Sequence, residues 1–173
     1  AWQRVATDGQ GRVFVARKPT NASAFEAEIE VLPGANDRRR PVLAASPLGK
    51  MWIAWETVDL NTVEAASADI ADPTTWVQTS AVPAPTGYTQ LCHPAIAVDS
   101  TGSTVYLAFE TSNGSGAEIG AVSLASGGAT WTALPATASG ILSSEAGTKA
   151  DPAVAVGYLD MLYVAWANAT DGC

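Results

Sequence analysis

Four segments of the chain share one pattern of hydrophobic and polar positions: a short apolar strand, a turn and a second apolar strand. The segments begin at Gln3, Arg40, His93 and Asp151. Each second strand carries an alanine that marks the register: Ala16, Ala54, Ala108 and Ala165. Successive markers are 38, 54 and 57 residues apart, which predicts an array of repeated β units and not a helical heptad.

The second strand of each segment is a continuous apolar run rich in β-branched and aromatic residues. The four runs are Val13–Val15, Trp52–Trp55, Val105–Phe109 and Leu162–Trp166. Such residues favour strands, and an unbroken apolar run predicts burial of both faces. Glycine, aspartate, serine and proline between first and second strands predict hairpin turns at 8–11, 46–49, 99–102 and 157–160.

Further strands complete the predicted units. Third strands are expected at 25–31, 62–68 and 118–124, and fourth strands from the Thr75-Trp76 and Thr130-Trp131 pairs. The pattern predicts an all-β fold, a β-propeller of four-stranded antiparallel blades with about four repeats. The repeats span residues 3–36, 40–82, 93–136 and 151–173 of a single domain, 1–173.

The predicted blade count leaves two units short of strands. The first unit lacks a clear fourth strand, and the last has only two. Two completions stay open: Trp2 ends a fourth strand that pairs with the last unit and closes the ring, or the chain is a partial propeller completed by another chain or by further sequence. An uncovered strand edge favours association, so a homo- or hetero-oligomer is one expectation.

Two segments resemble the Asp-box of a known repeat superfamily. The segment Leu124–Trp131 is similar to a degenerate SxDxGxTW box of the BNR repeats found in sialidase-like β-propellers. Its Gly, Thr and Trp match, whereas Leu124 and Ser126 stand where the box has Ser and Asp. Residues 67–76 are similar with a longer loop. The resemblance implies a structural turn away from the active site, so the tryptophan that ends each segment is expected to pack between strands.

Composition and charge narrow the range of partners. With 9 basic and 17 acidic residues, the net charge of −8 argues against a nucleic-acid partner. No apolar stretch reaches the roughly 20 residues of a membrane span. The sequence starts at Ala1 without a leader, which fits a mature protein that is secreted to the extracellular space or periplasm; a fragment would look the same.

The repeat register predicts a ring of polar residues at one end of the array. Neighbouring strands run antiparallel, so the start of each first strand lies beside the end of the second. This places the residues that precede three prolines, Arg40, His93 and Asp151, near those two beyond the marker alanines: Lys18, Glu56, Glu110 and Ala167. Propellers commonly bind ligands at such a mouth, although a solvated rim without a ligand gives the same pattern.

One short motif raises the question of catalysis. Residues 39–43 resemble the RxPxL stretch of sialidases, in which an arginine binds the substrate carboxylate. The family also uses two further arginines, and every arginine here lies at or before position 40, so three successive units cannot supply the triad. Glu56 and Glu110 are the candidate carboxylate pair for hydrolysis.

The two cysteines are predicted to lie at the same end of adjacent units. A Cys92–Cys173 disulfide is therefore expected, which would indicate an oxidising compartment; two separate thiols are the alternative. The cysteines lack metal-ligand spacing, and neither a metal nor a cofactor is expected.

These observations support one leading hypothesis and two alternatives. The leading hypothesis is a secreted, non-catalytic module that binds a glycan or a protein partner. Its candidate ligand-binding residues are Arg39, Arg40, Glu56, His93, Glu110 and Asp151. The alternatives are a sialidase-like glycoside hydrolase, or a fragment of one, and a structural subunit of a larger extracellular assembly.

Overall fold

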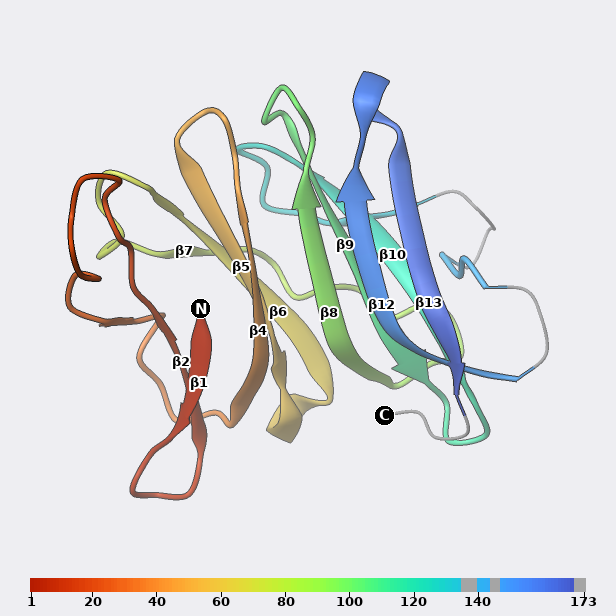
Figure 1. The fold of residues 1–173 in the computed structure, drawn as a ribbon. Helices are drawn as coiled ribbons and strands as arrows, with labels where there is room; N and C mark the ends of the chain where they lie inside the picture. The colour runs from red at the N-terminus through yellow and green to blue at the C-terminus, as the bar shows by residue number, and fades with distance from the viewer. Residues whose placement is uncertain (135–139, 144–146, 170–173) are drawn as a thin grey trace.

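The computed structural model describes residues 1–134, 140–143 and 147–169, and these form four antiparallel sheets (Figure 1). The first sheet contains β1 (Trp2–Val5), β2 (Gly11–Val15) and β3 (Ile29–Glu30). The second contains β4 (Arg38–Ala45), β5 (Lys50–Thr57), β6 (Thr62–Asp69) and β7 (Val77–Gln78). The third contains β8 (Gln90–Val98), β9 (Thr104–Ser112), β10 (Ala117–Ala125) and β11 (Thr132–Ala133). The fourth is the hairpin β12 (Thr148–Val156) and β13 (Leu162–Ala169).

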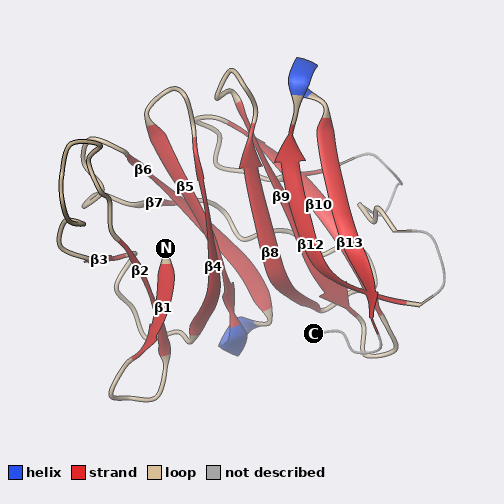
Figure 2. Ribbon diagram, viewed as in Figure 1, coloured by secondary structure: helices blue, strands red, loops and turns tan. Residues whose placement is uncertain are grey.

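Each sheet follows the order of the chain, so every neighbouring pair of strands is antiparallel. The helices of the described residues are two short 3-10 turns, η1 (Val58–Leu60) and η2 (Tyr158–Asp160), at strand connections (Figure 2). Neither is long and apolar enough to cross a membrane. The predicted all-β fold is confirmed, while the closed ring of a propeller stays a prediction.

The hairpin turns form where the sequence predicts them. Gly9, Gly49 and Gly102 supply the positive φ angles, 83°, 79° and 73°, that these turns require. Trp2 differs from its expected place: it begins β1, pairs with Phe14 of β2 and stacks on that ring at 6.4 Å. Trp2 therefore belongs to the first sheet and does not end a strand that completes the last unit.

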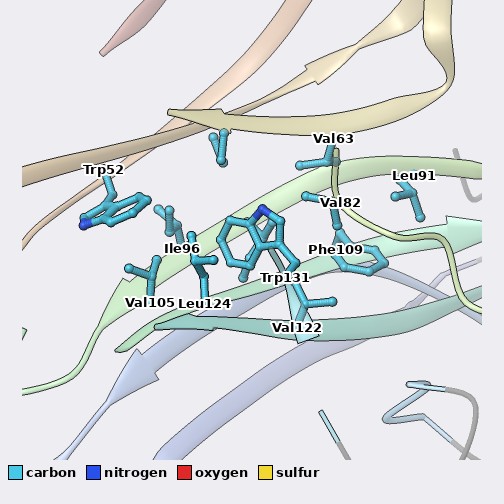
Figure 3. Packing of buried hydrophobic residues seen from close by; sticks show 13 residues of the cluster. Trp52, Val63, Val82, Leu91, Ile96, Val105, Phe109, Val122, Leu124 and Trp131 are labelled. Atoms are coloured by element: carbon cyan, nitrogen blue, oxygen red, sulfur yellow. The ribbon is translucent and has the colours of Figure 1, made fainter. Parts of the chain in front are cut away.

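β5 is buried on both faces and packs two sheets against its own. Trp52 and Ala54 point into one hydrophobic cluster, shared with β9 and β10 of the third sheet (Figure 3). Ile53 and Trp55 point into a second cluster, shared with Val13 and neighbouring residues of the first sheet. The continuous apolar run predicted this double burial, because successive residues of a strand face opposite sides.

The two tryptophans of the Asp-box-like segments lie in these clusters. Trp131 is buried in the first cluster, and its Nε1 donates a hydrogen bond to Thr79 Oγ1 at 3.0 Å (Figure 3). Trp76 is buried in the second cluster. Both segments connect the third and fourth strands of their sheets, so the expected packing role is confirmed.

The first strands of successive sheets are neighbours. β4 lies beside β8, and β8 lies beside β12, whereas β2 of the first sheet lies beside β4 (Figure 1). A buried hydrogen bond joins the first two sheets: Gly11 N–H donates to Asp37 Oδ1 at 2.8 Å. The approach is close, because a Cβ atom at Gly11 would lie 2.4 Å from the backbone oxygen of Arg38.

Replacing Gly11 with alanine should lower the free energy of unfolding by about 2 kcal/mol, because overpacking forces the backbone of the second sheet to shift. Thermal and urea denaturation measure the change. The control is Gly116→Ala, where an added Cβ meets nothing within 4 Å. Equal stability of the two variants would show that the first sheet is not tightly docked at Gly11.

Candidate functional site

A β-bulge interrupts the first strand in three of the four sheets. The register shifts between Arg39 and Val42 in β4, between Cys92 and Ala95 in β8, and between Ala150 and Ala153 in β12. The three bulges hold Arg40-Pro41, His93-Pro94 and Asp151-Pro152. Each proline lies inside its strand and not at the first strand position. A bulge accepts proline because the missing N–H leaves no gap in an already interrupted ladder.

The polar residue of each bulge has a left-handed backbone conformation. The φ angles are 50° at Arg40, 47° at His93 and 51° at Asp151. A non-glycine residue in this region costs about 1–3 kcal/mol, which the surrounding sheet must offset. Because the three residues share one conformation at one register, the bulges turn three equivalent side chains toward the same end of the molecule.

The three bulges surround one hollow with a volume of about 290 Å³. Its lining residues are Arg40, Pro41, Val42, His93, Pro94, Asp151 and Pro152. Three sheets thus contribute one charged or titratable side chain each, and three prolines supply apolar surface. The volume lies just below the range of about 300–1,000 Å³ that is typical of small-molecule sites, so the hollow is small.

His93 joins a buried carboxylate to an exposed one. Its Nδ1 lies 2.8 Å from Glu110 Oε2 and 3.4 Å from Asp151 Oδ1. The Glu110 side chain is fully buried, whereas that of Asp151 is 80% exposed. His93 thus links the two carboxyl groups through a single ring nitrogen. Glu110 Oε1 is buried and has no hydrogen-bond partner among the described residues.

A parallel arrangement supports Arg40. Its NH1 group lies 3.3 Å from Oε2 of Glu56, whose side chain is 16% exposed. Glu56 and Glu110 occupy the same register, two residues after the marker alanines of β5 and β9. Neither glutamate lines the hollow; each instead contacts the bulge residue that does. At the equivalent position β13 has Ala167 in place of a glutamate. The third bulge residue, Asp151, instead contacts His93 of the neighbouring sheet.

Arg39 lies outside the group that lines the hollow. Its NH2 and Nε groups contact the carboxylate of Asp37 at 2.6 and 3.3 Å, as a bidentate pair. The hydrogen bond that Arg39 donates to Asp37 raises the pKa of the Arg39 guanidinium. Burial raises the pKa of Asp37, but the hydrogen bonds from Arg39 and Gly11 outweigh this and leave it below its ordinary value. Arg39 thus stabilises the connection between the first two sheets.

Three of the predicted polar residues, Arg40, His93 and Asp151, line one hollow, and apolar surfaces that were not predicted lie between them. Val42 and the three prolines line the hollow, although the prolines entered the sequence reading only as register markers. The signal that could have identified the bulges is the polar-proline dipeptide at equal register in three units. Lys18, expected at the same mouth, is not among the lining residues.

One group of side chains could in principle hold a metal ion. Single ligand atoms of Cys92, His93 and Glu110 lie within 4.8 Å of one another. Cys173, the predicted disulfide partner of Cys92, lies outside the described residues, so the disulfide stays a prediction. If Cys92 is in a disulfide, two ligands remain, fewer than a zinc centre uses. Of these three residues, His93 lines the hollow and Glu110 contacts His93.

Comparison with known proteins identifies a similar fold. No family model matches the sequence, and no curated protein matches it. The solved structure of an α-L-arabinofuranosidase from Lactobacillus brevis is similar, with a TM-score of 0.54 and 13% sequence identity. The alignment covers 97% of this chain and 59% of that chain. At this identity the likeness shows a common all-β fold, and this chain spans 59% of the length of the solved one.

The strained bulge at position 40 predicts an unusual order of stability. Arg40→Gly should be more stable than Arg40→Ala by about 1 kcal/mol, because glycine adopts the left-handed region without a Cβ penalty. Both variants remove the same ion pair with Glu56, so the comparison isolates the backbone. Chemical denaturation gives the difference. An alanine variant as stable as the glycine variant would show that Arg40 carries no backbone strain.

Proposed function

We propose that the hollow between β4, β8 and β12 binds one sugar residue of a glycan. The observation that carries the proposal is the convergence of three bulges from three sheets on one concave surface. Arg40 and His93 offer hydrogen-bond donors, and the exposed carboxylate of Asp151 offers acceptors. The proline rings offer apolar surface to the C–H face of a sugar.

The charge at the site favours a neutral sugar over an acidic one. Among the described residues, the ion pairs of Glu56, Glu110 and Asp151 are made with one permanent cation, Arg40, and with His93. A ligand carboxylate would enter an environment that already holds more negative than positive groups, and like charges repel. Arg39, the arginine that matches the sialidase-like motif, is paired with Asp37.

The proposal includes the wider setting of the protein. We infer a secreted, propeller-like module, supported by the repeated sheets, the similar solved fold and the predicted disulfide. A protein partner and a structural role in a larger assembly remain alternative proposals. Peptide mapping with and without reduction tests the disulfide and hence the oxidising compartment.

Titration with a panel of neutral and acidic oligosaccharides tests the binding site. A neutral glycan should bind, and Asp151→Asn should weaken binding about ten- to a hundredfold, since the loss of a charged hydrogen-bond acceptor costs about 1.5–3 kcal/mol. His93→Gln should weaken binding to a similar extent. The matched control is Asp69→Asn at the opposite end of β5 and β6, where Asp69 pairs with Lys50 in the ladder.

Two results would contradict this assignment: no binding by any member of the panel, or equal loss in Asp69→Asn and Asp151→Asn. A preference for acidic sugars would overturn the charge argument while leaving the location of the site intact. Isothermal titration calorimetry measures affinity and stoichiometry together.

Glycoside hydrolysis is the second candidate function. It is favoured by the similarity of the fold to a protein described as an α-L-arabinofuranosidase. The chemistry would need one carboxylic acid and one carboxylate at the sugar. Asp151 lines the hollow, and the buried Glu110 contacts His93, which lines it too.

Assays with aryl glycosides, including an aryl arabinofuranoside, distinguish the two functions. Under the binding proposal no turnover is expected. Turnover that falls about a hundredfold or more in Glu110→Gln, but not in Asp69→Asn, would replace the binding proposal with hydrolysis, because removal of a general acid or base has an effect of that size.

A further inference from the structure

β13 has the sequence of a doubly buried strand but is exposed. Its run Tyr163–Trp166 corresponds to Trp52–Trp55 of β5 when the marker alanines are aligned. Trp52 is 2% exposed and Trp55 is fully buried, whereas Tyr163 is 59% exposed and Trp166 is 38% exposed. Leu159 and Met161, just before the strand, are exposed as well. The first and third sheets cover the corresponding side chains of β5, whereas those of β13 are exposed.

Among the described residues, β13 also lacks the third strand that pairs with β5 and β9 in their sheets. In the second sheet β6 pairs with β5 in a register that sets Ala54 opposite Ala65. In the third sheet β10 pairs with β9 in the same register, with Ala108 opposite Ala121. β13 pairs with β12, and among the described residues no strand lies along its other edge (Figure 1). An open edge of eight residues is a template for strand addition.

The tryptophan of β13 indicates which chemistry fits the edge. In the second sheet Trp55, one residue after the marker alanine, donates its indole N–H to Glu64 Oε2 of β6 at 3.2 Å. Trp166 stands at the same register in β13. None of the described residues accepts a hydrogen bond from its indole, so an acidic residue on an added strand would satisfy the same donor.

We propose that the edge of β13 along which no described strand lies binds an extended peptide segment of the β6 type. The segment has small apolar residues, pairs antiparallel with β13 and places a glutamate opposite Trp166. Three observations favour this occupant: the edge continues an existing ladder, the register is that of two complete sheets, and β13 has no charged side chain to oppose a negative one. The proposal is independent of the sugar site at the hollow.

A synthetic peptide with the sequence of residues 61–79, which includes Glu64 and Trp76, tests the proposal on the full chain. The peptide should bind with one-to-one stoichiometry and slow the hydrogen exchange of β13 amides. A double-mutant cycle between Trp166→Phe in the protein and Glu64→Leu in the peptide isolates the indole hydrogen bond. Each single change should weaken binding about tenfold, and the two together should weaken it no further.

A control peptide with prolines at positions 65 and 66 cannot pair along either edge, because proline lacks the N–H donor. Equal binding of this peptide would overturn the proposal, since it would reveal apolar adhesion without strand pairing. Additive losses in the cycle would refute the predicted register. A concentration-dependent dimer that protects the β13 amides without peptide would instead identify a second copy as the occupant.

Discussion

The burial of β5 on both of its faces is the constraint on which the rest of the structure depends. A strand can bury both faces only if a sheet lies on each side, and sheets pack face to face about 10 Å apart. Trp52 on one face and Trp55 on the other fix the third and first sheets relative to the second. β9 is likewise buried on both faces, whereas the described residues do not cover Tyr163 and Trp166 of β13.

This stacking explains why the candidate site forms at the first strands. Once β5 and β9 are fixed, β4, β8 and β12 become neighbours and their equivalent ends converge. A regular ladder would leave side chains at these ends alternating between faces. The bulges break the alternation at one register in each strand and turn Arg40, His93 and Asp151 into one hollow. The packed sheets offset the strain that the bulges introduce.

The sequence predicted more of the fold than of the site, for physical reasons. Apolar runs and glycine turns act locally, so the hairpins and the double burial of Trp52 and Trp55 followed from the pattern. Repeat register also brought Arg40, His93 and Asp151 together. The polar-proline dipeptide recurs at all three bulges, but one such dipeptide also fits the start of a regular strand, so the signal lies only in its repetition at equal register. The pairing of Arg39 with Asp37 depends on tertiary contact with Gly11, and no local signal marks it.

Glu110 shows how the core and the candidate site constrain each other. A fully buried carboxylate is costly unless it is paired, and only one of its oxygens contacts a partner, His93. An apolar residue at this position would avoid the cost of burying a carboxylate. The contact has a consequence at the hollow: Glu110 Oε2, 2.8 Å from His93 Nδ1, restricts the orientation of the His93 ring, which would preorganise the proposed binding site. A preorganised ring lowers the entropy cost of binding, and Glu56 acts on Arg40 in the same way.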